Sequence, residues 1–170
     1  FSEFDAINVI ERLIEICNAL HTSNPPILLN GLSLNNIMYD LSSGAEEIVL
    51  RNLINLRNFE SSFKFNHIDG VSPFLISSES FNNIFTPKSD QFNIAAILYL
   101  LIEGIPPWYD EKKLNLKNTD QIDDFLDQRD LPLKFLNIKD GHLKNVITKS
   151  LDSNSENRFN SLQEMLGFLN

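Results

Sequence analysis

Two kinds of residue are scarce in this sequence, and each shortage excludes a class of protein. A single cysteine, Cys17, among 170 residues excludes an internal disulfide framework and a metal site built from several cysteines. Basic residues number 14 against 23 acidic ones, which gives a formal net charge of -9. Nucleic acid is therefore not expected as a partner, because its phosphates need a basic face.

Membrane and targeting signals are also missing. The chain has neither a basic amphipathic helix nor an apolar run of about 20 residues, so membrane insertion is not expected. It does not open with a signal peptide, which favours the cytoplasm, with the nucleus as the alternative. Cys17 lies within an apolar helical pattern, and this favours a buried thiol over a nucleophile.

Apolar residues, in contrast, are plentiful. They make up 42% of the chain, with 13 phenylalanines, and we expect residues 1–170 to form a single domain around one core. The run from Ile94 to Ile102 is apolar without a break and predicts a central helix over about 90–103 that is buried on all sides. We therefore expect a mostly α (α+β) fold with a small β-hairpin over about 36–51. The other expected helices cover 4–21, 120–128, 140–151 and 160–169.

Motifs in three stretches, read in order, resemble the C-terminal lobe of protein kinases. "ALHTSNPPILLNGLSLNNIMYD" resembles the end of a kinase helix followed by the catalytic loop H-R-D-L-K-x-x-N and an apolar pair. "SDQFNIAAILYLLIEGIPPW" resembles the start of the family's central helix and the Gly and Pro positions that follow it. "DSNSENR" resembles the D-x-x-x-x-x-R before the last helix. The fold that these motifs imply is a protein-kinase-like C-terminal lobe.

The catalytic loop of this resemblance has lost its reactive residues. Gly31 stands where the family has its general-base aspartate, and a positioned base contributes about 10²–10⁴-fold to a rate. Leu29, Asn30 and Ser33 replace the His, Arg and Lys of the motif. Asn36, which helps to hold a metal in the family, is kept. The loop is therefore predicted to be inactive.

The metal-binding Asp-Phe-Gly motif is missing as well. By spacing it falls on Asn52 and Leu53, and no aspartate occurs between Asp40 and Asp69 that another register could supply. Magnesium prefers carboxylate oxygens, so we expect no metal and no cofactor. The chain is predicted not to be an enzyme. Nucleotide binding is left open, with Met38 at the position that lies under the adenine ring in the family.

The resemblance also implies that residues which hold a kinase lobe together are retained. Asp90 matches the aspartate that accepts backbone N–H groups of the catalytic loop. Glu79 and Arg158 match a buried ion pair, and breaking such a pair from one side costs about 3–5 kcal/mol. Leu29 and Leu53 keep two positions of the family's internal stack apolar. This combination is typical of a pseudokinase.

We therefore expect a non-catalytic pseudokinase module that acts as a protein-interaction scaffold or allosteric regulator within a larger protein. A kinase-type N-terminal lobe is not present in this chain, which begins inside a helical pattern as a fragment would. The faces that such a lobe covers in the family would then bind a protein partner, such as a kinase-type N-terminal lobe or another subunit.

A second candidate contact surface lies near residue 120. An apolar stripe of Ile122, Phe125 and Leu126 is rimmed by aspartates, as the core of an interface is. Trp108 and Tyr109, in "PPWYDEKK", could extend this partner-binding stripe. The alternative is an amphipathic helix that buries the stripe in its own domain.

Two other interpretations stay open. One is a nucleotide-binding protein or atypical phosphotransferase that uses a displaced acidic residue, Asp40 or Glu47. The other is a helical adaptor that resembles kinases by chance, and failure of Glu79 to meet Arg158 would favour it. The segment 55–74, at the activation-loop position, carries aromatic residues that either close the vacant face or anchor a partner.

Overall fold

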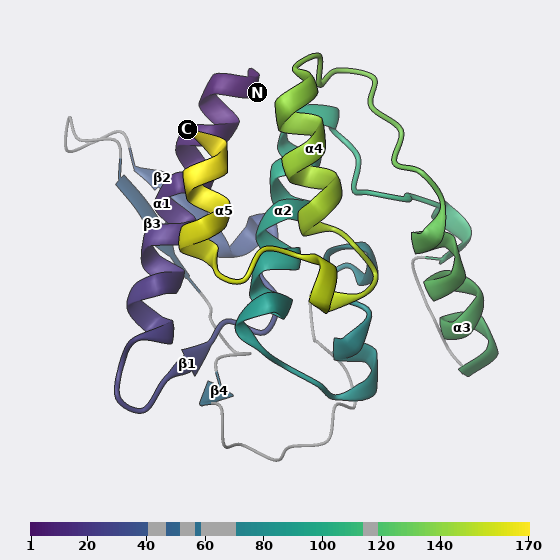
Figure 1. The fold of residues 1–170 in the computed structure, drawn as a ribbon, viewed down its shortest axis with the longest axis horizontal. Coiled ribbons are helices and arrows are strands. Elements are labelled where there is room, and N and C mark those ends of the chain that lie inside the picture. Colours follow the sequence, from purple (N-terminus) through teal and green to yellow (C-terminus); the bar gives the residue numbers. More distant parts are fainter. Residues whose placement is uncertain (41–46, 52–56, 59–70, 114–118) are drawn as a thin grey trace.

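The computed structural model describes residues 1–40, 47–51, 57–58, 71–113 and 119–170. Within these ranges the fold is mostly helical with a small hairpin, as predicted (Figure 1). The helices are α1 (Glu3–His21), α2 (Pro87–Glu103), α3 (Thr119–Asp127), α4 (Gly141–Ser150) and α5 (Leu162–Leu169). The strands are β1 (Ile27–Leu28), β2 (Ile37–Asp40), β3 (Glu47–Leu50) and β4 (Arg57–Asn58). Short 3₁₀ turns cover Leu34–Asn36, Pro73–Leu75, Glu79–Asn82, Glu111–Lys113, Gln128–Asp130 and Ser155–Asn157.

Helix α2 is the centre of the fold. At its start, the Ser89 hydroxyl accepts the backbone N–H of Thr86 at 3.1 Å. It ends at Gly104, whose φ of 78° is the left-handed conformation that favours glycine. Every residue from Ser89 to Tyr99 is buried, because α1, α4 and α5 pack around the helix. The predicted central helix at about 90–103 is confirmed, with its start at Pro87.

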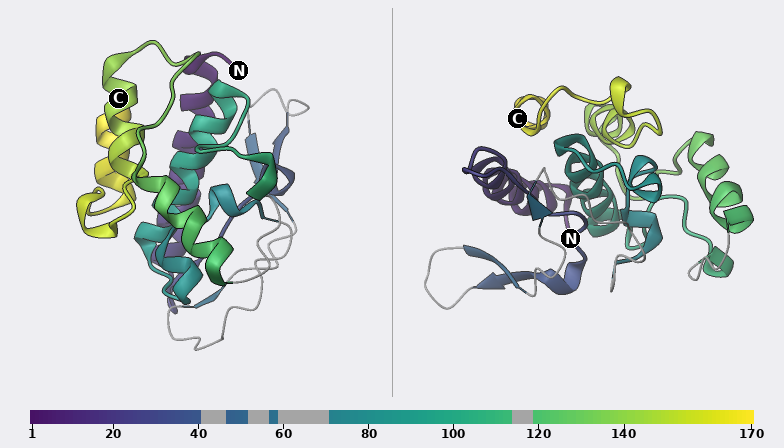
Figure 2. Two further views of the ribbon diagram at one scale, coloured as in Figure 1. Left: turned by 90° about the vertical axis from the view of Figure 1, so that its right-hand side faces the viewer. Right: turned by 90° about the horizontal axis from the view of Figure 1, so that it is seen from below.

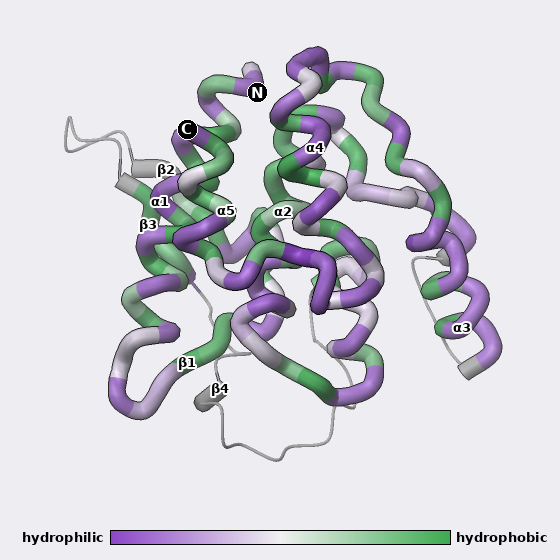
Figure 3. Tube along the Cα trace, viewed as in Figure 1, coloured by the Kyte–Doolittle hydropathy of each residue, from purple (hydrophilic) through white to green (hydrophobic). Residues whose placement is uncertain are grey.

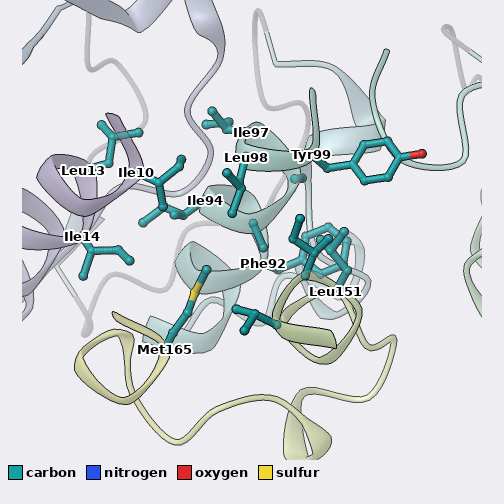
Figure 4. Close-up of a cluster of buried hydrophobic side chains, with 14 of the residues drawn as sticks. Ile10, Leu13, Ile14, Phe92, Ile94, Ile97, Leu98, Tyr99, Leu151 and Met165 are labelled. Atoms are coloured by element: carbon teal, nitrogen blue, oxygen red, sulfur yellow. The ribbon is translucent and has the colours of Figure 1, made fainter. Parts of the chain in front are cut away.

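Side chains from α1, α2 and α5 meet in one core (Figure 4). On α1, Ile10, Leu13 and Ile14 point toward α2, and Met165 reaches the same core from α5. Fully burying one side chain of this kind stabilises a fold by about 1.5–3 kcal/mol, so this core supplies much of the energy that positions the helices. The α2 residues that line it are Phe92, Ile94, Ile97, Leu98 and Tyr99.

Two small antiparallel sheets accompany the helices. The predicted hairpin is present as β2 and β3, with Ile37 opposite Leu50 at one end and Asp40 opposite Glu47 at the other. Strand β1 pairs with β4, and β4 is the strand of this pair that the sequence did not predict. A strand of two residues is too short for an alternating pattern to reveal it.

Helix α3 lies at the opposite edge of the molecule from the β2–β3 hairpin, as Figure 1 and the right-hand view of Figure 2 both show. Most residues of α3 are hydrophilic, and its few hydrophobic residues recur at helical spacing (Figure 3). Its apolar side packs against its own domain, with Phe125 buried. Among the helices in the described ranges, none has both the length and the apolar character needed to cross a membrane.

Candidate functional site

The loop from Leu29 to Asn36 is held by the start of α2. The backbone N–H groups of Leu29 and Asn30 donate to the two carboxylate oxygens of Asp90 at 2.9 and 3.0 Å. Asp90 is buried, so water competes little for these charge-assisted bonds. His21 Nε2, at the end of α1, lies 2.9 Å from the same carboxylate. Asp90 thus joins two helices to the loop.

Asn93 provides a second anchor, one turn after Asp90 on α2. Its Oδ1 accepts the backbone N–H of Leu32 at 2.7 Å. Its Nδ2 donates to the carbonyls of Leu32 and Leu75 at 3.0 and 2.9 Å. The sequence analysis did not single out Asn93. The available signal was a polar residue within an apolar helix, three positions after Asp90, because such a residue needs buried partners.

Gly31 lies between these two anchors. Its φ is 96°, and that of the preceding Asn30 is 52°, so both residues adopt the left-handed region. Glycine enters this region without steric cost, and asparagine enters it more readily than most residues. Gly31 has no side chain that could accept a proton. The loop is therefore fixed on both sides of a position that carries no base.

Asn36 ties the end of the loop to the hairpin. Its Oδ1 accepts both the backbone N–H and the hydroxyl of Ser33, at 2.8 and 2.9 Å. Its Nδ2 donates to the carbonyl of Arg51 at 3.1 Å. A metal ligand role would compete with two hydrogen bonds for one oxygen. The geometry therefore favours a positioning role for Asn36.

The nucleotide-facing candidates are described only in part. Asn52 and Leu53 lie outside the described residues. Met38 lies on β2 opposite Val49 of β3, and these two side chains are 40% and 43% exposed. Adjacent, exposed and apolar, they form a patch that an adenine ring or a second protein surface could cover.

Glu79 and Arg158 form a bidentate ion pair. Arg158 Nη1 and Nη2 donate to the two Glu79 oxygens at 2.7 and 2.9 Å. Ser89 Oγ donates to the same carboxylate at 3.0 Å. Burial by itself raises the pKa of Glu79, but the hydrogen bonds and charge of Arg158 outweigh it, and the pKa is lowered. The pair joins the turn at Glu79–Asn82 to the segment before α5.

Arg129 is a structural residue that the sequence analysis missed. Its guanidinium donates to the hydroxyl of Ser78 and the carbonyl of Pro73, both at 3.0 Å, and to the carbonyl of Ile76. Burial lowers its pKa to about 9, with a smaller contribution from the charge of Arg158. An arginine among aspartates in "DQRD" reads as a surface residue, so no sequence signal pointed to it. The guanidinium carbon lies 4.9 to 5.5 Å from the ring centres of Phe81, Phe92 and Phe125.

Comparison with known proteins agrees with this arrangement. The structure superposes on a kinase of a Cydia pomonella granulovirus, PK-1, with a TM-score of 0.82 and 17% sequence identity, over 100% of this chain and 60% of the viral one. The chain has a protein-kinase-like fold. By sequence it is 24% identical over 113 residues to a calcium-dependent protein kinase, SK5, of Glycine max, which is 66% of this chain and 22% of that protein. No family model matches the sequence. The chain thus spans less than two thirds of either relative.

One part of the expected partner-binding stripe is wrong in this kinase-like fold. Phe125 is 0% exposed, and its ring lies 5.2 Å from that of Phe74 and 5.8 Å from that of Phe81. Packing against these two rings removes the Phe125 side chain from water, which stabilises the fold. The side chain of Phe125 is therefore unavailable to a partner. Ile122 and Leu126, on the same helix, are half-buried.

The two aromatic residues that were expected to extend the stripe differ in exposure. Trp108 is half-buried, with its ring stacked at 6.4 Å on Phe92 and its Nε1 donating to the carbonyl of Leu131 at 2.9 Å. Tyr109 is 44% exposed. Contact with a partner therefore stays a prediction for Trp108 and Tyr109.

In the expected activation-loop segment 55–74, only residues 57–58 and 71–74 are described.

Cys17, His21 and Asp90 bring three donor atoms within 4.8 Å of one another. Sulfur, imidazole and carboxylate are ligands that zinc accepts. The Asp90 oxygens already accept backbone N–H groups, however, and burial, with the charge of Asp90, raises the pKa of the Cys17 thiol well above its usual value. A metal would have to displace these hydrogen bonds and ionise a buried thiol. The cluster therefore fits a hydrogen-bonded anchor better than a metal site.

Proposed function

We propose that this chain is a non-catalytic, pseudokinase-type module that acts by binding other proteins, as a scaffold or an allosteric regulator. The observation that carries the proposal is Gly31. By the kinase resemblance Gly31 matches the general-base position, and the backbone of its loop is anchored by Asp90 and Asn93. A chain that keeps these anchors and lacks the base retains the shape of the site without its proton acceptor.

The energetics of phosphoryl transfer support this reading. Kinases position the substrate hydroxyl with an aspartate and neutralise the developing charge with metal ions. Loss of a positioned base alone lowers a rate by about 10²–10⁴-fold. Asn36, which in kinases helps to hold a metal, here uses its amide to fix Ser33 and Arg51. These hydrogen bonds support a structural role for the loop over a role in phosphoryl transfer.

The exposed apolar pair Met38 and Val49 supports a role in protein contact. Apolar side chains that lie together on a surface mark interaction sites when a partner can cover them. A kinase-type N-terminal lobe or another subunit fits this position. The kinase activities named for PK-1 and SK5 belong to those proteins, of which this chain spans only a part.

The alternative, a nucleotide-binding or atypical phosphotransferase activity, would need a displaced acid such as Asp40 or Glu47. These residues pair with each other at the end of the hairpin remote from Ile37. At about 3.3 Å per residue, three residues along a strand place Asp40 roughly 10 Å beyond Ile37. Their backbone position therefore favours neither as a replacement for the missing base.

The decisive experiment is a phosphate-transfer assay with radiolabelled ATP, several protein substrates and either magnesium or manganese, run beside calorimetric titration of ATP. We expect no transfer above the level of a buffer blank. Nucleotide binding at 100 times Kd would stabilise the fold by about 2.7 kcal/mol, which a thermal shift resolves separately from transfer. Transfer that disappears in Asp40→Ala or Glu47→Ala would overturn the proposal in favour of the alternative.

A further inference from the structure

A groove runs between the segment that follows α2 and the segment that follows α3. One hollow in it has a volume of about 510 Å³ and is lined by Tyr99 of α2 and by some of the residues within the segments 105–111 and 128–134. Its apolar lining includes Ile105, Trp108 and Leu131, and Leu131 is 60% exposed. Such side chains lose unfavourable contact with water when an apolar group covers them.

The wall of the groove is fixed before any partner arrives. Trp108 Nε1 donates to the carbonyl of Leu131 at 2.9 Å, and the Tyr99 hydroxyl donates to the carbonyl of Lys134. The carboxylate of Glu103, at the end of α2, accepts the backbone N–H groups of Leu136, Asn137 and Ile138. A preformed wall binds with less loss of conformational entropy than one that must order first.

A second hollow of about 270 Å³ continues the groove on the other side of Trp108 and Leu131, which line both. The apolar ridge of these two residues therefore has a hollow on each side. An extended chain segment could place an apolar side chain against the ridge and its neighbours in the two hollows. Extended peptides are recognised in this way, by alternating pockets along a groove.

Acidic side chains stand at both ends. Asp110 and Glu111 line the first hollow, while Asp130 and Asp152 line the second. A basic residue lines each hollow as well, Lys134 the first and Arg129 the second, where the guanidinium is buried and donates to Pro73 and Ile76. The acidic side chains outnumber the basic one in both hollows, and in a chain with a net charge of -9 the surrounding field is negative. A cationic segment would therefore be drawn to both ends of the groove and an anionic one repelled.

We propose that this groove binds an extended basic segment of a partner protein, with an apolar residue on the Trp108–Leu131 ridge and lysine or arginine on either side of it. A proline-rich ligand fits less well, because such ligands are held by free aromatic donors and the Trp108 N–H is already bonded to Leu131. The inference rests on the proposed function, since it names the partner class of a module that works by contact.

The test is a selection of random peptides on the wild-type chain, followed by titration of the recovered peptides against three groove variants and one control variant. Asp110→Lys with Glu111→Lys reverses the charge at one end, and Leu131→Ser removes one of the two apolar side chains of the ridge. Glu111→Lys alone keeps the bond from the Lys112 N–H to Asp110 and guards against a local loss of structure. Asp120→Lys with Asp123→Lys is the matched control, because both residues are exposed on α3 and line neither hollow.

We expect recovered peptides to carry basic residues around an apolar one, and the groove variants to weaken binding by about tenfold or more. The control should weaken it by no more than about twofold, and added salt should weaken it throughout. Three results overturn the inference: no peptide recovered above background, acidic or purely proline-rich peptides, or equal weakening by the control. These binding outcomes are separate from the phosphate-transfer assay, so either idea can fail without the other.

Discussion

The guanidinium of Arg158 binds both carboxylate oxygens of Glu79, although the two residues lie 79 positions apart in the sequence. The same guanidinium also donates to the carbonyls of Asp152 and Lys88, at 2.8 and 3.0 Å. One buried side chain therefore joins the turn at Glu79–Asn82, the first turn of α2 and the segment that follows α4. The loss of Arg158 would free all of them together.

Removing one partner of this pair is expected to destabilise the fold. Arg158→Met should lower the free energy of unfolding by about 3–5 kcal/mol, because it leaves the Glu79 carboxylate buried and unpaired. Urea unfolding of wild type and variant measures the difference. The double variant Glu79→Gln with Arg158→Met should recover part of the loss, and a double variant that is less stable than Arg158→Met would contradict the pairing.

The same pair makes stability depend on pH. The folded pKa of Glu79 is lowered from the ordinary value of 4.5, so the pair contributes fully above pH 4.5 and its contribution is lost as the pH falls through the folded value. Unfolding free energies measured from pH 6 downward should therefore fall more steeply for wild type than for Glu79→Gln. Equal slopes would show that Glu79 does not carry this dependence.

Asp90→Ala is expected to loosen the loop around Gly31. Two buried backbone N–H groups, of Leu29 and Asn30, would lose charged acceptors, and hydrogen bonds to charged groups contribute about 1.5–3 kcal/mol each. Hydrogen exchange should accelerate at these two amides, with a matching drop in stability. Asp123→Ala, at an exposed carboxylate of α3, is the control and should leave both measurements unchanged.

An aspartate introduced at Gly31, which matches the kinase base position by resemblance, is not expected to give activity. Gly31→Asp places a side chain at φ 96°, and a left-handed conformation costs about 1–2 kcal/mol for a residue other than glycine. No aspartate lies between Asp40 and Asp69, where the kinase resemblance expects the metal-binding one. We expect a lower melting temperature and no phosphate transfer. Transfer by Gly31→Asp would mean that the rest of the site is competent.

Tyr99 should weaken the fold at alkaline pH. Burial, together with the charge of Glu103, raises the pKa of Tyr99 from 10.0 to about 12. The folded state therefore keeps a proton that the unfolded state loses, so stability falls as the pH rises from 10 to 12. Tyr99→Phe should begin less stable, because it lacks the bond to Lys134, and should lose less over this range. A parallel loss in both proteins would assign the effect to other groups.

Local patterns in the sequence were enough to predict the helices and the hairpin. The unbroken apolar run at Ile94–Ile102 is stable only when it is buried on every side. Two prolines follow the first helix and Gly104 follows α2, and both residue types end helices through their backbone geometry. The sequence also shows that Gly31 cannot accept a proton, because the identity of a residue decides whether it carries a base. Strand β4 was not legible, since its two residues pair only through contact with β1.

The sequence by itself determined which chemical groups this protein possesses and where its helices form, because both depend on neighbouring residues. Only the tertiary structure decided which groups meet. Phe125 is buried because its ring packs against those of Phe74 and Phe81. The buried guanidinium of Arg129 is stabilised by backbone carbonyls and the faces of aromatic rings. The groove beside Trp108 exists only where segments after α2 and α3 pass each other. Packing brings together residues that are distant in the chain, and a local sequence pattern does not show which of them will be in contact.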